Sequence, residues 1–217
     1  MDLFEAIQKR KSARAFLDKM VSRKEIREII AFAGMAPSAI NLQPWEYLVT
    51  YGEEKERLVR RLLKARTERQ VSCGPGTAKP LPRHFTERSR SSVRIMQPFI
   101  DKTGKSFNQF IEEGSCRFYG APVAIIVTLD QVFPKIRYLD VGLSVAYLLL
   151  AAQAKGLATC PVGLITAYGD EIADVLNIPE DKEILLAIAL GYPDEGSPIN
   201  CYKTQREPLD HIRSWYE

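Results

Sequence analysis

The sequence predicts an α+β fold, with a mostly antiparallel central sheet flanked by helices. Strand-like and helix-like stretches mix along the chain without the regular alternation of a doubly wound parallel sheet. Hydrophobic residues make up 46% of the 217 residues and charged residues 26%, a composition that suits a globular chain with one well-filled core. We therefore expect a single domain over residues 1–217.

Several stretches have the apolar period of helices. The clearest begins at Ser22-Arg23-Lys24-Glu25, where the serine and the glutamate form a capping box, and it ends at Gly34. The apolar residues between them recur on one face, as in a helix that packs on a core. The other predicted helices are residues 2–10, 53–69, 140–155 and 170–176.

Four apolar runs are predicted to be strands. The first is rich in aromatic and β-branched residues. The second is apolar on both faces, as buried strands are, and the fourth is also predicted to be buried. The predicted strands are Trp45–Tyr51, Ala121–Thr128, Ala158–Leu164 and Ile184–Leu190.

Residues 71–117 are expected to be an insertion that covers the functional site, with short helices. Cys73-Gly74-Pro75-Gly76 and three further prolines interrupt the pattern, and a long irregular stretch in a compact domain is usually functional or disordered. Its arginines leave nucleic-acid binding open as the lowest-ranked alternative. They include Arg83, Arg88, Arg90 and Arg94.

Net charge and cysteine usage argue against several classes of protein. Lysine and arginine total 30 against 27 acidic residues, and a formal charge of +3 does not favour nucleic acid or a membrane as the partner. The cysteines form no Cys-x-x-Cys pair, which argues against a metal site and favours scattered reduced thiols. They are Cys73, Cys116, Cys160 and Cys201.

The chain shows no signal-peptide or membrane-span pattern. Met1-Asp2-Leu3 is not followed by the basic and apolar regions of a signal peptide. The most apolar stretch, Leu143–Ala154, is shorter than the ~20 residues that a membrane span needs. We expect a cytoplasmic protein without a membrane partner.

A basic cluster follows the first predicted helix. Arg10, Lys11 and Arg14 place three positive charges beside the hydroxyl of Ser12, a combination that suits a phosphate or an electron-rich heterocycle. Basic residues at a helix end also commonly serve only to stabilise it. Taken alone, Lys203 and Arg206 are best explained as part of a solvated tail.

Five motifs, in this order, resemble the FMN-dependent nitroreductase family over nearly the whole chain. They are Arg-x-Ser-x-Arg at 10–14, Pro-Ser-x-x-Asn-x-Gln-Pro-Trp at 37–45, Cys160-Pro161-Val162-Gly163, Gly191-Tyr192-Pro193 and Arg206-Glu207-Pro208. The resemblance implies a nitroreductase-like fold and a homodimer with FMN at the subunit interface. It also implies ping-pong hydride transfer from NADPH or NADH, through flavin N5, to a nitroaromatic, quinone or similar electron-poor acceptor.

The resemblance implies which residues contact FMN. Arg10 and Ser12 would contact its phosphate and ribityl chain, and Lys11 between them is also assigned to the cofactor. Lys203 and Arg206 would form a second phosphate clamp, and Arg14 would approach the pyrimidine side. A loop would reach the flavin of the partner subunit; its contacts are Pro37, Ser38, Ala39 and Asn41.

The Cys160-Pro161-Val162-Gly163 motif is implied to act through its backbone. The main-chain N–H groups of Gly163 and Leu164 would point at flavin N5 and O4, with Pro161 and Val162 against the ring, so no catalytic side chain is required. A glycine at 163 departs from relatives that have a glutamate in this turn. Cys160 itself is expected to be a buried structural thiol.

Other assignments stay open. Ser115 and Arg117 are candidates for a further pyrimidine contact, and Arg117 has an external salt bridge as its alternative. The same fold would also suit reductive dehalogenation, enone reduction, flavin fragmentation or a non-catalytic flavin-binding protein. Because no Gly-x-Gly-x-x-Gly motif follows a strand, nicotinamide is expected to dock transiently over the flavin. The physiological acceptor and the preference between NADH and NADPH are not predicted.

Overall fold

A computed structural model describes residues 1–69, 71, 77 and 79–216. These residues form one four-stranded sheet in the order β1-β2-β4-β3, and each neighbouring pair is antiparallel. The prediction of a mostly antiparallel sheet is therefore confirmed. The strands are β1 (Trp45–Tyr51), β2 (Val123–Asp130), β3 (Ala158–Val162) and β4 (Lys182–Gly191).

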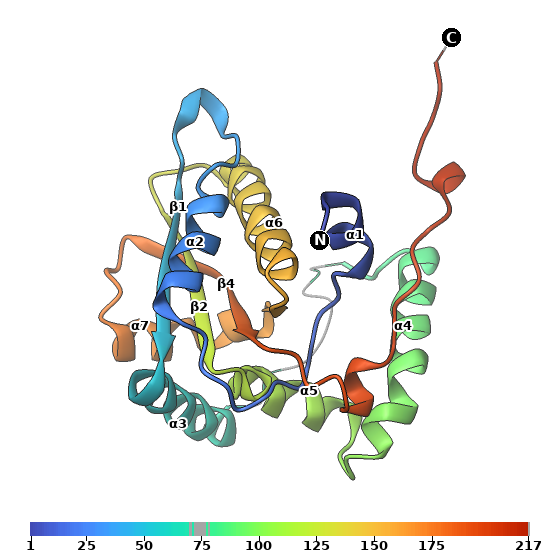
Figure 1. Cartoon of the computed structure of the whole chain (residues 1–217), viewed down its shortest axis with the longest axis horizontal. Helices are drawn as coiled ribbons and strands as arrows, with labels where there is room; N and C mark the ends of the chain where they lie inside the picture. The colour runs from blue at the N-terminus through green and yellow to red at the C-terminus, as the bar shows by residue number, and fades with distance from the viewer. Residues whose placement is uncertain (70, 72–76, 78, 217) are drawn as a thin grey trace.

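Helices cover both faces of the sheet (Figure 1). Helices α2 (Arg23–Ala33) and α6 (Tyr138–Ala154) pack on one face, while α3 (Gly52–Glu68) and α7 (Gly169–Leu176) pack on the other. Along β2, alternate side chains enter the two cores: Ile125 belongs to the first and Ile126 to the second. This alternation explains why β2 is apolar on both faces.

The helices predicted near the start of the chain are present, and α2 begins with the predicted capping box. The Glu25 backbone N–H donates to Ser22 Oγ at 3.2 Å, and the Ser22 N–H donates to Glu25 Oε2 at 3.0 Å, which completes the capping box of α2. Helix α1 (Leu3–Lys9) also forms. The helix predicted over residues 170–176 forms as α7 (Gly169–Leu176), and Asp170 does not cap it, because it lies inside the first turn and pairs with Arg69.

The described part of the insertion contains longer helices than the short ones expected. Helix α4 (Arg83–Asp101) includes Pro98, and α5 (Phe107–Cys116) follows it. Tertiary packing overrides the helix-breaking signal of proline, because Met96 and Ile100 of α4 are buried against Tyr202 of the C-terminal segment. The predicted break at Cys73–Gly76 lies outside the described residues.

The segment after α1 and the segment after β4 come together beside β3 and β4. Ser12 forms an isolated parallel bridge with Thr159 of β3, and Phe16 forms an antiparallel bridge with Pro193, just after β4. The N–H of Arg14 donates to the side chain of Asn200 at 2.8 Å. The segment after α1 therefore lies between the sheet and the C-terminal tail.

One helical stretch, Lys135–Ala154, is long and apolar enough to cross a membrane, judged by length and composition alone. It comprises a 3-10 turn, η3 (Lys135–Arg137), and helix α6. Helices that cover a sheet in a globular core meet the same criterion. In α6, Val141, Leu148 and Ala152 are buried against the sheet, and the opposite side of the helix stays exposed.

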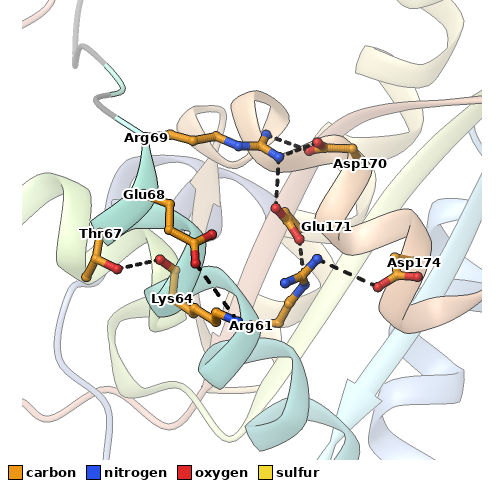
Figure 2. Close-up of polar contacts among 8 residues, drawn as sticks. All are labelled: Arg61, Lys64, Thr67, Glu68, Arg69, Asp170, Glu171 and Asp174. Carbon is orange, nitrogen blue, oxygen red and sulfur yellow. Dashed lines mark hydrogen bonds and ion pairs between the residues drawn. The ribbon is translucent and has the colours of Figure 1, made fainter.

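A charged cluster joins α3 to α7 (Figure 2). Glu171, with a side chain only 5% exposed, pairs through one carboxylate oxygen with Arg61 Nε at 2.5 Å and through the other with Arg69 Nη2 at 2.8 Å. Arg69 also donates to Asp170, and its hydrogen bond holds the pKa of that carboxyl below the usual range. A buried carboxylate with two guanidinium partners is costly to disturb, because losing it leaves their charges unpaired.

We expect Glu171→Gln to lower the free energy of unfolding by about 1–2 kcal/mol, measured by chemical denaturation at fixed protein concentration. The loss stays below that of a fully buried pair because the Arg61 and Arg69 side chains are 37% and 41% exposed. Glu54→Gln is the matched control, since Glu54 pairs with Arg57 at the surface. Equal losses in the two variants would contradict the prediction.

Candidate functional site

A cavity of about 540 Å³ lies between the two ends of the chain. Its walls come from α1, the segment after it, α4 and the C-terminal tail. The residues predicted to clamp a phosphate from opposite ends of the sequence all line this one cavity, together with Arg14. They are Arg10, Lys11, Ser12, Lys203 and Arg206.

The cavity concentrates positive charge. Within the part of the chain that the structure describes, no carboxylate lies within 4.0 Å of its arginines and lysines. Partial burial lowers the pKa of Arg10, and the nearby charge of Arg206 lowers it further. Like charges gathered without a counter-charge favour binding of an anion.

Asn200 anchors the basic segment, and sequence reasoning missed it. Its side chain is buried, accepts from the N–H of Arg14, and donates to the carbonyls of Ala15 and Asp194 at 2.8 and 2.9 Å. The backbone carbonyl of Asn200 accepts a hydrogen bond from Lys11 Nζ. A lone asparagine in a polar tail carries no sequence signal for this role, because its partners in the basic segment lie more than 180 residues away.

Arg14 is enclosed by aromatic rings from two distant segments. Its guanidinium carbon lies 5.6 Å from the ring centroid of Tyr119 and 5.8 Å from that of Tyr202. Neither tyrosine lies in a motif that marks it for this role in the sequence. Arg117, a candidate pyrimidine contact, pairs with Glu113 at 3.1 Å with its side chain half exposed. This is the external salt bridge given as its alternative.

The motif around Gly163 lies at the end of β3. Pro161 and Val162 belong to that strand, Gly163 follows it, and Leu164 begins a 3-10 turn, η4 (Leu164–Tyr168). None of the four lines the cavity itself. A Cβ atom at Gly163 would meet no heavy atom within 4 Å among the described residues, so this side of the turn is open.

Cys160 immediately precedes this motif, beside Arg14. Burial raises the pKa of its thiol, against the opposing effect of the Arg14 charge. A neutral, fully buried thiol is a poor nucleophile, which agrees with the structural role expected for it. Across residues 1–69, 71, 77 and 79–216, no cluster of three or more His, Cys, Asp or Glu side chains has the arrangement of a metal site.

The Pro37–Asn41 segment lies away from the cavity, at the top of the sheet in Figure 1. The N–H of Ala39 donates to Asp140 at the start of α6, at 3.4 Å, whereas Ser12 contacts the strand that follows the end of α6. The 17 residues of α6 span about 25 Å, which separates the two groups. Within one chain, therefore, Pro37, Ser38, Ala39 and Asn41 do not meet the basic cluster.

A model of the nitroreductase family matches residues 7–192. This chain belongs to the nitroreductase family. A 4-nitrobenzoate reductase of Pseudomonas putida is 34% identical over 209 residues, covering 95% of this chain and 92% of the relative. An iodotyrosine deiodinase of Thermotoga neapolitana is 26% identical over 196 residues, and the match covers 90% of this chain and 91% of the relative.

The nitroreductase fold is equally evident in three dimensions. The FMN-dependent nitroreductase NfnB from Mycobacterium smegmatis, solved in complex with NADPH, superposes with a TM-score of 0.88 at 27% identity, and the match covers all of both chains. The family and the α+β fold predicted from the sequence motifs are thus confirmed.

Proposed function

We propose that this nitroreductase-family protein is an FMN-dependent oxidoreductase that uses NADPH or NADH to reduce electron-poor acceptors in a ping-pong cycle. The observation that carries the proposal is the convergence on one cavity of cations from both ends of the chain, which pair with no carboxylate among the described residues. FMN, when bound, accepts a hydride at N5 from the nicotinamide and passes it to the acceptor. The relatives named for nitroaromatic reduction make 4-nitrobenzoate the first acceptor to test.

The cavity fits the phosphate end of FMN. A doubly charged phosphate offsets the repulsion between Arg10 and Arg206, and Lys11, Lys203 and the Ser12 hydroxyl supply further donors. Arg14, deeper between the tyrosine rings, is assigned to the pyrimidine side. A positive charge there favours the reduced cofactor.

The turn after β3 is assigned to the flavin ring. Backbone N–H groups of Gly163 and Leu164 supply donors toward N5 and O4, and Pro161 and Val162 lie against the ring. With no side chain at position 163 and open space beside it, access to the reacting edge is unobstructed. The protein thus contributes orientation and electrostatics, and no side-chain nucleophile or acid–base pair is needed.

A homodimer completes the proposed site. Exposed apolar side chains line one face of α1 and α6, including Phe4 at 76% and Leu139 at 65% exposure. A groove of about 640 Å³ with mostly apolar walls lies between the same helices. An apolar face of this kind favours association with a second copy. The proposal places Pro37, Ser38, Ala39 and Asn41 against the flavin of that partner.

Two charges on this face are expected to separate the subunits. Leu139 and Leu143 lie one helical turn apart on the exposed side of α6, so Leu139→Glu combined with Leu143→Glu places two carboxylates in the proposed interface. We expect light scattering to show a monomer with reduced FMN content. Val132→Glu, at an exposed apolar position off this face, is the control. A double variant that keeps the mass of a dimer would refute the proposed interface.

The remaining features of the proposal concern the chain as a whole. We propose one domain over residues 1–217, in which the insertion at 71–117 covers the site; its Ser92 and Met96 line the cavity wall. We also propose a cytoplasmic location. The cysteines that the structure describes, Cys116, Cys160 and Cys201, are unpaired, as is usual in a reducing compartment.

The decisive experiment is anaerobic spectroscopy of the purified protein. We expect flavin absorption bands at about one FMN per chain, bleaching by NADPH or NADH, and rapid return of the bands on adding 4-nitrobenzoate. Colourless protein that takes up no FMN would reject the proposal. Bands that no nicotinamide bleaches would indicate a non-catalytic flavin-binding protein.

The same assay separates the rival tasks of this fold. Iodotyrosine, an enone and a quinone are added in turn to the reduced protein. Return of the bands with iodotyrosine but not with 4-nitrobenzoate would identify a reductive dehalogenase, the activity for which several relatives are named. Loss of the flavin itself would point to flavin fragmentation.

A further inference from the structure

Two tyrosines hold the guanidinium of Arg14 at the wall of the cavity. Its carbon lies 5.6 and 5.8 Å from the ring centroids of Tyr119 and Tyr202, within cation–π range of both. The Tyr202 hydroxyl also accepts a hydrogen bond from Arg14 Nη1. Burial raises the pKa of both tyrosines, so the rings stay neutral. The two rings thus orient the cation, which is only partly exposed at the cavity wall.

Tyr119 reaches Arg14 through an unfavourable backbone. Phe118 and Tyr119 have φ angles of 49° and 54°, in the left-handed region that residues with side chains rarely occupy. Backbone strain of this kind persists where the surroundings enforce it, and it concentrates at functional sites. The chain therefore bears a conformational cost at the residue whose ring contacts Arg14.

Gly114 makes the approach of Tyr119 possible. A Cβ atom at position 114 would lie 2.4 Å from Cε1 of the Tyr119 ring, closer than real contacts allow. Gly114 lies within α5, where glycine is otherwise unfavourable. Helix geometry, backbone strain and ring contact thus all bring the same tyrosine to Arg14.

We propose that Tyr119 and Tyr202 are positioning residues that hold Arg14 as a fixed cation for the pyrimidine edge of the flavin, which makes the bound cofactor easier to reduce. This inference rests on the proposed FMN function. Arg14 lines the cavity, and among the described residues its buried Nε has no hydrogen-bond partner, so a donor remains for a ligand. A fixed charge at this edge stabilises added electron density more than a mobile, hydrated one does.

Binding to the apoprotein tests the geometry. Flavin fluorescence measures the affinity for oxidised FMN and for riboflavin, which lacks the phosphate. We expect Tyr119→Leu and Tyr202→Leu to lower the affinity for FMN and for riboflavin by the same factor, about three- to tenfold. Tyr119→Phe and Tyr202→Phe keep the rings and should have smaller effects. Tyr51→Leu is the matched control, because it removes a cation–π contact with Arg23 outside the cavity.

The midpoint potential of bound FMN separates positioning from support of the fold. If the tyrosines only support the fold, their loss lowers the affinities for oxidised and reduced FMN equally and leaves the midpoint potential unchanged. We expect both leucine variants to lower it, by about 30 mV for each additional tenfold loss of affinity for the reduced form. In an Arg14→Gln background, Tyr119→Leu should cause no further decrease, because the ring acts through Arg14.

The outcomes are distinct. An unchanged potential in both leucine variants, with FMN still bound, would overturn the inference while leaving the proposed function intact. Additive decreases in the Arg14→Gln background would also overturn it. Wild-type protein that binds neither FMN nor riboflavin would overturn the proposed function instead. If Tyr119→Leu fails to fold, as judged by circular dichroism, Tyr202→Leu tests the same clamp from the C-terminal segment.

Discussion

Replacing Arg206 with alanine is expected to weaken FMN binding by about 10- to 100-fold, the range for loss of charge-assisted hydrogen bonds to a phosphate. Arg206 is exposed and lines the cavity, and its side chain bonds only to Thr204 and Gln205 of its own tail within the described chain. Its charge also depresses the pKa of Arg10, and both side chains line the same cavity, where one anion offsets their repulsion.

Fluorescence titration of the apoprotein measures this effect, and riboflavin provides the internal control. Because riboflavin lacks the phosphate, its affinity should not change in Arg206→Ala. Arg213→Ala is the matched variant, since Arg213 belongs to the same tail but pairs with Asp210 and does not line the cavity. The thermal midpoint without FMN should not fall, because the substitution removes a repulsion. Unaltered affinity for FMN would show that the phosphate assignment is wrong.

Gly191→Ala is expected to lower the free energy of unfolding by about 3 kcal/mol, near the upper end for an overpacked core. A Cβ atom at the end of β4 would lie 2.5 Å from Cδ of Pro122 and 3.0 Å from Cδ1 of Phe16. The proline ring is rigid and immediately precedes β2, so it cannot move without disturbing the pairing of β2 with β4. Affinity for FMN is expected to fall too, because Phe16 follows Arg14 by two residues.

Chemical denaturation checks this prediction, with Gly169→Ala as the control. Gly169 has helical dihedral angles at the start of α7, and an added Cβ there would meet only Ile184, at 4.0 Å. Alanine at this position should leave stability unchanged or raise it slightly, because alanine favours a helix more than glycine does. Similar stability in the two variants would mean that the close contact at Gly191 is relieved without cost.

Much of the architecture follows from local sequence signals. Strand β1 has the predicted bounds Trp45–Tyr51, and helix α2 runs from its capping box to Gly34. Such elements were predictable because side-chain period and capping depend on residues three or four positions apart. Helix α4 was not, since Pro98 opposes it and its support comes from distant contacts such as those of Tyr202.

Some residues of the candidate site were also predictable from local sequence, and others were not. Sequence alone determined the family, the two cationic segments and the turn at Gly163, because these are contiguous motifs of particular residue types. Only the tertiary structure revealed Asn200 as the anchor of the basic segment and Tyr119 as the partner of Arg14. Asn200 and Tyr119 each lie more than a hundred residues from Arg14 in the sequence. The apolar period of a sequence depends only on residues a few positions apart, so it does not predict such contacts. Their meeting depends on how sheet, insertion and tail pack together.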